Sequence, residues 1–527
     1  MRNLKLLLGA VMVAGTTACQ DLTVENQNAP DRERATRQPV SAETFVASSF
    51  RTWWPVAGHD DYPSWALSTI ANEITSGFAD FGQLELSTEP RIAWNNSPSN
   101  GRAAVSETPW QGLYRTISAV NDALAAIDEG LVIENPSRTA RTKAVGKFMQ
   151  GISHGYLALY FDSAFVLDEH ARLDTISNPK FSGYQDVAAA AIDQLDEAIA
   201  VAQGTSFTLP GDNWFFTPLT SQQFVQLANS FAARIMVYSA RTPAERAAVD
   251  WTEVLRRIDN GIKADFAPMG QADILWDDWK RLVARVRTNP GDFGRPSYWV
   301  LGPADSTNGF VNWAATPVAN RMPFRMVTKD RRIHPAGAPT QRGKYVTYNS
   351  QNIFQVARGT YRFSHYYFHR YGTGTSWQDS PLVDMPVAEM DLLKAEALIR
   401  LNRAAEAVPL INKTRIANGE LPPVTVAGPP DEAGCVPRKL NGACGSLWDA
   451  LRYEKKIEGM AVTGVIAYFD ARGWQALPEH SILHLPIPGN ELAVLQRTLY
   501  SYGGPGGEGS APAPNMEQCP VALARCQ

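Results

Sequence analysis

The chain has 527 residues, with 49 lysines and arginines against 53 aspartates and glutamates, which gives a formal net charge of −4. This balance excludes the excess of positive charge that nucleic-acid-binding proteins and proteins attracted to anionic membrane surfaces carry. At this length the chain can form one large domain or up to about three smaller ones.

Residues 1–18 have the pattern of a secretory signal peptide. Arg2 and Lys5 give a positive start, residues 6–13 are apolar, and small residues lead to Cys19. The apolar stretch is too short to span a bilayer. A cysteine directly after small residues resembles the lipobox of bacterial lipoproteins, so we expect lipid on Cys19 and a polar tether over residues 19–37. The alternative is an ordinary signal peptide followed by a chance cysteine.

Apolar residues three and four positions apart recur along the body of the chain, residues 38–527. Such stripes are typical of amphipathic helices that pack on one another. They predict helices over residues 113–127, 148–159, 192–199, 224–235 and 254–262. A further helix pair is predicted from Met390 to Leu401 and from Ala407 to Gly419, with a turn at Asn402. Small alanines would let these two helices approach closely, as in a tetratricopeptide-like hairpin, although a strict repeat of about 34 residues is absent.

Three long segments between the helical stretches differ in composition. Residues 51–109, 264–325 and 327–381 are rich in Trp, Tyr, Gly, Pro, Asn and Asp. Loops of this length in a compact domain usually have a function. Short alternating stretches at 345–348 and 361–367 predict strands of small hairpins. The expected fold is therefore mainly α, a scaffold of helix pairs whose irregular loops and hairpins form a ligand face.

Four of the five cysteines lie near the C-terminus of a chain that the signal directs to an oxidising compartment. Four cysteines allow three connectivities, and the sequence does not decide among them. We expect the near neighbours to pair, Cys435 with Cys444 and Cys519 with Cys526. A metal site at these cysteines is disfavoured because no histidine spacing accompanies them. We expect no metal or cofactor, although a calcium site built from loop oxygens would need no fixed spacing.

Several segments together resemble the SusD/RagB family of nutrient-binding outer-membrane lipoproteins. The residues that carry the resemblance are Trp110, Tyr114, Ile117 and Asn121; Ala228, Asn229, Ala233 and Arg234; Ala395, Glu396, Ala397, Ile411, Asn412 and Arg415; and the closing segments 453–459, 469–473 and 485–492. They follow the order and spacing of that family across nearly the whole mature chain. Two departures are Lys455 and Lys456, where the family usually has arginines, and Val462-Thr463-Gly464, which replaces an arginine-containing turn.

The resemblance implies a tetratricopeptide-like helical fold, attachment to the outer membrane facing the cell exterior, and a partner of the SusC kind. That partner is a TonB-dependent β-barrel transporter to which the lipoprotein delivers an oligosaccharide or a similar nutrient. The family residues Glu454, Asp470 and Arg472 are interpreted as buried ion pairs that fix helix ends rather than as catalysts, because breaking a buried pair is costly.

Candidate ligand residues follow from the chemistry of sugar binding. Pyranose rings stack on aromatic faces while amide, carboxylate and guanidinium groups bind the hydroxyls. One short segment combines these types, Arg91, Trp94, Asn95 and Asn96, and a second group contains Tyr298, Trp299 and Trp313. The alternative is that these aromatic residues form small cores under the long loops.

The common enzyme motifs are absent from the sequence, which has no His-Glu-x-x-His, no Gly-x-Ser-x-Gly, no phosphate loop and no dinucleotide fingerprint. We therefore expect a binding protein and not an enzyme. Two alternatives remain. A glycoside hydrolase needs only two carboxylates, for which Asp60-Asp61 or Asp277-Asp278 are candidates. A helical-repeat scaffold for protein interactions is the other, because fold alone does not set function.

Overall fold

The computed structural model describes residues 38–75, 80–171, 180–283, 294–338, 340–350, 359–370 and 378–514. Cys19, the tether over residues 19–37 and the predicted pair Cys519 and Cys526 lie outside these ranges, so these predictions stay untested. Each helix within the described ranges is too short or too polar to cross a bilayer.

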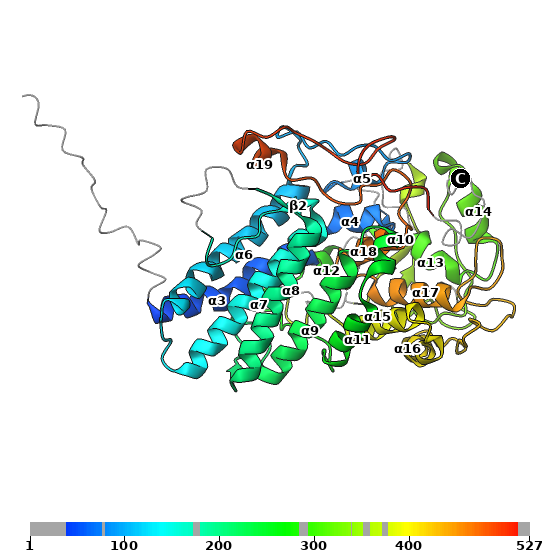
Figure 1. Ribbon diagram of the computed structural model, residues 1–527. Coiled ribbons are helices and arrows are strands. Elements are labelled where there is room, and N and C mark those ends of the chain that lie inside the picture. Colours follow the sequence, from blue (N-terminus) through cyan, green and yellow to red (C-terminus); the bar gives the residue numbers. More distant parts are fainter. Residues whose placement is uncertain are drawn as a thin grey trace, which may run out of the picture.

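Long helices that follow one another in the chain pack side by side (Figure 1). They are α3 (Pro39–Trp54), α6 (Ala104–Asp128), α7 (Pro136–Tyr160), α8 (Tyr184–Gly204) and α9 (Ser221–Tyr238). The apolar stripes predicted from the sequence lie on α6 to α9 and face the larger hydrophobic cluster of the protein. The helical interpretation of these stretches is therefore confirmed.

The centre of α7 packs closely on its neighbours because two glycines face them. A Cβ atom at Gly151 would lie 2.9 Å from Leu195 of α8, and one at Gly155 would overlap Ile235 of α9. Contacts this short are not seen for real Cβ atoms, so a larger residue at either position would push the helices apart. The glycines thus set the spacing of the helical layer.

A second group of helices continues the scaffold. It contains α10 (Pro243–Ala248), α11 (Trp251–Asp259), α15 (Val387–Arg400), α16 (Ala404–Ala417), α17 (Leu447–Gly459), α18 (Ile466–Gly473) and α19 (Gly489–Val494). The predicted pair is α15 and α16, which pack on each other across a turn where Asn402 has a φ of 58°. Asparagine tolerates this left-handed conformation better than most residues, which explains the sharp reversal. The stripe predicted to reach residue 262 ends earlier, at Asp259.

The long loop segments are less irregular than their composition predicts. They contain η1 (Pro55–His59), α4 (Ser64–Ile70), α5 (Gln83–Ser87), α12 (Asp278–Val283), α13 (Tyr298–Leu301), η3 (Gly302–Ala304), α14 (Gly309–Ala315), η4 (Val318–Asn320) and η6 (Thr360–Arg362). Several of their aromatic residues, among them Trp65, Trp279 and Trp313, form a second hydrophobic cluster together with Tyr453 and Ile457 of α17. Burial of these rings explains why short helices form in segments rich in Gly and Pro.

All four sheets in the described part of the chain are two-stranded and antiparallel. They pair β1 (Ile74–Thr75) with β6 (Arg295–Pro296), β2 (Ser163–Ala164) with β3 (Ser182–Gly183), β4 (Thr208–Leu209) with β5 (Leu219–Thr220), and β7 (Val346–Tyr348) with β8 (Tyr366–Phe368). The stretch predicted at 345–348 forms β7, whereas only the end of the stretch predicted at 361–367 lies in β8 and its start lies in η6. In this hairpin Val346 lies opposite Phe368. The mainly helical fold with a few small hairpins is therefore confirmed.

Buried charges connect the helices. Glu454 accepts a hydrogen bond of 2.6 Å from Arg332, and Asp470 accepts hydrogen bonds from Arg246 at 2.9 Å and Lys455 at 2.7 Å. These contacts agree with the structural role expected for both acids. Arg472 differs from the expectation, because its guanidinium donates to the backbone carbonyls of Leu483 and Tyr238 rather than to a carboxylate.

Candidate functional site

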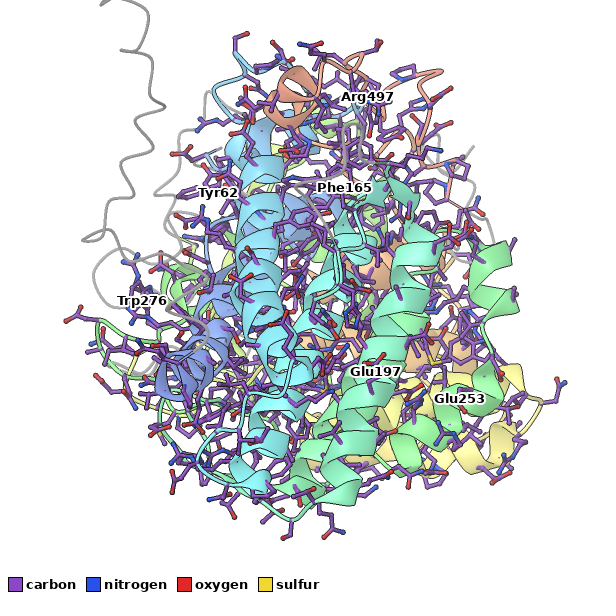
Figure 2. The ribbon with its side chains drawn as sticks, turned by 60° about the vertical axis from the view of Figure 1, so that its left-hand side comes forward. Tyr62, Phe165, Glu197, Glu253, Trp276 and Arg497 are labelled. Atoms are coloured by element: carbon purple, nitrogen blue, oxygen red, sulfur yellow. A yellow bond between two sulfur atoms is a disulfide. The ribbon has the colours of Figure 1, made fainter. Side chains whose placement is uncertain are left out.

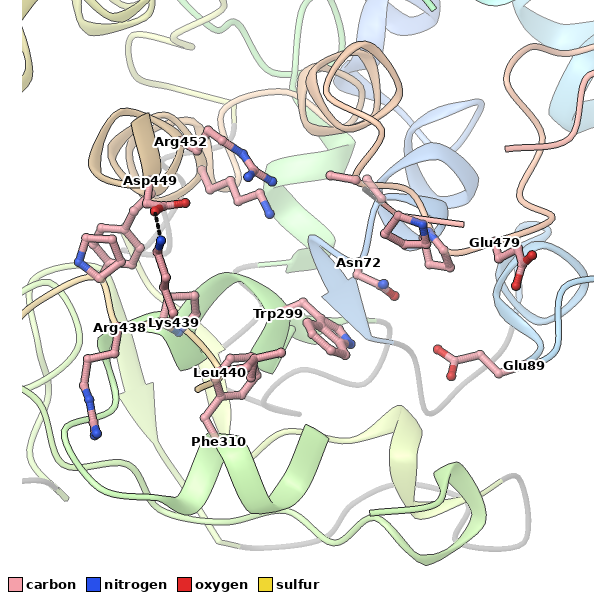
Figure 3. A pocket seen from close by; sticks show the side chains of 18 of the residues that line it. Asn72, Glu89, Trp299, Phe310, Arg438, Lys439, Leu440, Asp449, Arg452 and Glu479 are labelled. Carbon is pink, nitrogen blue, oxygen red and sulfur yellow. Dashed lines mark ion pairs between the residues drawn. The ribbon is translucent and has the colours of Figure 1, made fainter. Parts of the chain in front are cut away.

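A cavity of about 350 Å³ lies where the second hydrophobic cluster meets α17 and the C-terminal segments (Figure 3). Its walls come from several segments of the chain, some of them hundreds of residues apart in sequence. They are residues 71–72 and 89–91, the α13–α14 region, the loop over residues 437–440, one face of α17, and residues 476–480 with Pro514. The tertiary fold alone brings these parts together.

One wall of the cavity is the face of α17 that carries Asp449, Arg452, Tyr453 and Lys456. Positions three and four apart share a helix face, so these side chains line one surface. The helix starts at a capping box in which the Ser446 hydroxyl accepts the Asp449 backbone N–H, while the Asp449 carboxylate accepts the Ser446 backbone N–H. The cap fixes the first turn of α17 and with it the position of Asp449 at the cavity.

The opposite wall is aromatic. Trp299 of α13 and Phe310 of α14 line the cavity, and their ring centroids lie 5.5 Å apart at an interplanar angle of 82°. The Ser297 side chain accepts the backbone N–H of Trp299 and fixes the start of α13. Phe310 is buried, whereas Trp299 is half-buried, so part of its indole remains open to a ligand. Figure 3 shows Trp299 in the centre of the site.

A disulfide loop forms a third wall. Cys435 and Cys444 are bonded, which confirms the first of the two predicted pairings. Arg438 donates to the backbone carbonyls of Gly442 and Thr307 and so ties the loop to the segment before α14. Lys439 forms an ion pair of 3.6 Å with Asp449 (Figure 3). These contacts hold the loop against α17.

The cavity has an excess of positive charge. Five lysines and arginines line it, namely Arg91, Arg438, Lys439, Arg452 and Lys456, against three carboxylates, those of Glu89, Asp449 and Glu479. Glu89 lies 3.7 Å from Arg321, and Asp449 pairs with Lys439. Arg452 and Lys456 form no ion pair with these acids, although Asp449 acts on Arg452 at longer range.

Arg452 and Lys456 stand out because neither side chain forms a hydrogen bond or ion pair in the described part of the chain, although Asp470 acts on both at longer range. Lys456 is half-buried and forms no hydrogen bond or ion pair there. Burial, with a smaller contribution from the nearby Arg452 guanidinium, lowers the pKa of Lys456 to about 7. Arg452 is 7% exposed, its Nε has no hydrogen-bond partner, and its guanidinium lies 5.5 Å from the Trp474 ring. Burial also lowers the pKa of Arg452.

The predicted ligand residues do not form one site. Arg91 and Trp299 line the cavity, and Trp299 and Trp313 line a smaller neighbouring one. Tyr298 and Trp313 are buried in the second hydrophobic cluster, where the Tyr298 hydroxyl donates to the Phe324 carbonyl. Their burial agrees with the alternative that these two aromatics form a small core.

The segment around Trp94 lies against the C-terminal strap, residues 481–502, rather than in the cavity. Trp94 is 3% exposed and belongs to the larger hydrophobic cluster. Asn96 donates to the backbone carbonyls of Ile487 and Tyr500, while Asn95 is exposed. The side chains of this segment therefore serve packing and loop attachment in this structure.

Sequence reasoning missed Phe310, Arg452 and the position of Lys456 at the cavity. Lys455 and Lys456 appeared only as departures from a family pattern, and the structure separates them. Lys455 points inward to Glu396 and Asp470, whereas Lys456 lines the cavity. The usable signal was the spacing of Arg452 and Lys456, because two cations four residues apart on one helix repel each other unless an anion compensates them.

The acids considered for hydrolysis lie elsewhere. Carboxylate oxygens of Asp60, Asp61 and Asp278 lie within 4.8 Å of one another, and burial raises the pKa of Asp60 to about 6 and that of Asp61 to about 7. Asp277 accepts hydrogen bonds from Lys280 at 2.7 Å and from the His59 ring at 2.8 Å. None of these acids lines the cavity that Trp299 and Lys456 share.

Comparison with known proteins gives agreement at the level of structure only. No family model and no curated protein matches the sequence. A SusD superfamily protein from Parabacteroides distasonis superposes with a TM-score of 0.55 at 12% identity, covering 88% of this chain and 99% of its own. The chain has the SusD fold.

Two further solved structures agree with this assignment. A SusD superfamily protein from Bacteroides thetaiotaomicron has a TM-score of 0.51 at 14% identity, covering 83% of this chain and 90% of its own. A SusD-like carbohydrate-binding protein from Bacteroides fragilis has a TM-score of 0.50 at 16% identity, covering 92% and 97%. The expected SusD-like architecture is thereby confirmed, whereas identities this low leave the ligand of this SusD-like chain to be argued from its own cavity.

Proposed function

We propose that the protein is a lipid-anchored outer-membrane binding protein that captures an oligosaccharide or similar nutrient and delivers it to a SusC-like TonB-dependent transporter. The observation that carries the binding part of this proposal is the cavity with Trp299 on one side and polar groups of α17 on the other. An aromatic face opposite hydrogen-bonding groups is the arrangement that a sugar ring requires. The SusD-like fold, shared with a carbohydrate-binding protein, supports the same conclusion.

Replacing Trp299 by alanine tests the binding site. We expect the affinity for the bound oligosaccharide to fall by about 1 to 3 kcal/mol, because a partly open aromatic anchor is lost. The affinity is measured by isothermal titration calorimetry after a screen of polysaccharides and oligosaccharides. Trp276→Ala is the matched control, since Trp276 is 39% exposed and does not line the cavity. Figure 2 shows Trp276 at the left-hand edge of the molecule. Equal losses in both variants would contradict the assignment of the site.

Incubating the protein with each polysaccharide and oligosaccharide of the screen also distinguishes the alternative functions. A binding protein removes oligosaccharide from solution without forming products. New reducing ends would instead show a glycoside hydrolase, and the acids near Asp61 would then be the first residues to replace. Absence of both binding and products across the screen would favour a protein-interaction scaffold.

Lipid attachment rests on the sequence pattern around Cys19. We expect Cys19→Ala to release the protein from the membrane fraction, because the acyl chains supply the anchoring free energy. The measurement is fractionation of cells that lack the transporter, followed by mass spectrometry of the N-terminal peptide. A variant that still sediments with the outer membrane in those cells would show that another feature anchors the protein.

A further inference from the structure

The cavity combines a half-open aromatic face with two cations that form no hydrogen bond or ion pair within the described residues. Arg452 and Lys456 lie one helical turn apart on α17, and Trp299 and Phe310 form the facing wall. In Figure 3 the Arg452 guanidinium extends from α17 on the side of the cavity opposite Phe310. An aromatic face can stack on any sugar ring, whereas a pair of cations favours a ligand that carries a negatively charged group.

Other buried cations near this site have hydrogen-bond partners among the described residues, either acids or, as for Arg472, backbone carbonyls. Lys455, the chain neighbour of Lys456, contacts Asp470 at 2.7 Å and Glu396 at 3.4 Å. Arg332 contacts Asp330, Glu454 and Glu458. Burying a cation without a partner costs folding free energy, so the exception at Arg452 and Lys456 calls for a ligand that supplies the missing negative charge.

We propose that the ligand is an acidic oligosaccharide whose anionic group, a carboxylate or a sulfate ester, binds between Arg452 and Lys456 while a sugar ring stacks on Trp299. This inference rests on the proposed function and adds the charge class of the ligand. Arg452 can donate two hydrogen bonds to such a group, and Lys456 contributes a point charge. Glu89 and Glu479 lie on the side of the cavity away from Arg452 (Figure 3), where their carboxylates would repel a second anionic group and so set the orientation of the ligand.

The test uses pairs of ligands that differ only in charge. Oligogalacturonate is compared with its methyl ester, and sulfated galactan oligomers are compared with the desulfated form, by calorimetry on the full mature protein. We expect one acidic member to bind at least about 10-fold more tightly than its neutral counterpart. The pair in which this difference appears tells whether the anionic group is a carboxylate or a sulfate.

Variants then assign the difference to the two cations. Lys456→Met and Arg452→Met should each remove most of the preference for the acidic ligand, while the thermal midpoint stays equal or rises because a cation without a hydrogen bond or ion pair is removed. Lys413→Met is the matched control, since Lys413 is exposed and pairs with Asp391 away from the cavity. A cation with a purely structural role would give the opposite result, a lower thermal midpoint with the preference intact.

The pH dependence gives an independent readout. Lys456 loses its proton as the pH rises, so the affinity for the acidic ligand should fall by about 10-fold between pH 6 and pH 8.5. Lys456→Arg should keep the affinity and remove this dependence. Several other charged groups face the same space or lie next to it, namely Asp449, Arg452, Asp470, Glu89, Arg91, Arg438, Lys439, Glu479 and His480. His480→Gln is the control for the only histidine among them.

The outcomes separate the two proposals. Equal binding of the acidic and neutral members, or a preference that survives both Lys456→Met and Arg452→Met, would overturn the acidic ligand and leave an oligosaccharide-binding protein. Failure of every member of both pairs to bind would overturn the acidic ligand. The wider polysaccharide screen would then decide whether the protein binds oligosaccharides.

Discussion

Replacing Arg332 by methionine is expected to lower the free energy of unfolding by about 3 to 5 kcal/mol, because it leaves several buried carboxylates without their cation. The Arg332 side chain is fully buried. It donates to Asp330 at 2.7 Å, to Glu454 at 2.6 Å and to Glu458 at 2.8 Å. Two of these acids lie on α17, so the loss also disturbs the helix that carries Arg452 and Lys456 to the cavity.

The Arg332→Met variant should also gain a pH dependence. In the native protein Arg332 holds the pKa of Asp330 below its usual value, despite burial. Without the guanidinium, burial would raise the pKa of this carboxyl in the folded state above its value in the unfolded chain. Its contribution to stability is then complete below the unfolded pKa, near 4, and is lost as the pH rises through the folded pKa.

Urea unfolding at pH 5 and pH 7.5 measures both effects. Arg331→Met is the matched control, because Arg331 is half-buried and its described contact is a weak one, 3.4 Å to the His334 carbonyl. A loss below about 1 kcal/mol for Arg332→Met, or the same loss in the control, would show that the network contributes little net stability.

Replacing Trp94 by alanine is expected to lower the free energy of unfolding by about 3 to 5 kcal/mol through the cavity that it leaves. The sequence allowed two interpretations, a stacking platform or a core residue, and the 3% exposure of Trp94 favours the core. Its backbone N–H donates to Tyr502 at 3.0 Å, and the Ser501 hydroxyl donates to its carbonyl. The backbone of Trp94 is therefore tied to the C-terminal strap, while its ring belongs to the larger hydrophobic cluster.

Thermal unfolding and ligand affinity of Trp94→Ala decide between the two interpretations. We expect a large loss of stability and an unchanged affinity in protein that remains folded, since Trp94 does not line the cavity. Asn95→Ala is the control, because Asn95 is exposed on the same segment and should change stability by less than about 0.5 kcal/mol. Unchanged stability with weakened binding would restore the platform interpretation.

The helical scaffold could be predicted from the sequence because its signals are local. Apolar residues three and four apart in α6, α7 and α9 sit on one face of a helix whatever the rest of the chain does. The turn at Asn402 and the pair Cys435 and Cys444 are also local, since few residues separate their parts. The short helices α13 and α14 were missed because they depend on aromatic burial against distant segments, which leaves no periodic pattern.

The candidate site could be predicted only in part. Trp299 and Arg91 were named from composition and do line the cavity, but Trp94 and Tyr298 have the same composition around them and are buried. The sequence around an aromatic residue in a loop segment is the same whether its ring faces a ligand or a core, because the sequence does not tell which side of the loop faces the protein interior. Lys455 pairs with Asp470 and Lys456 has no such partner, because the face of α17 that carries Lys455 is the one that faces α18.

The sequence by itself determined the helix-pair fold and the signal pattern before Cys19, because periodicity, turns and leader composition act over a few residues. Only the tertiary structure decided which aromatic residues are open, which charges are paired and where the cavity lies. These properties depend on contacts between segments up to several hundred residues apart, such as Asn72, Trp299 and Lys456 around one cavity. These contacts decide which side chains are buried and lose their water. They also place the positive charges of Arg452 and Lys456 at the cavity, which is the basis for proposing an acidic ligand.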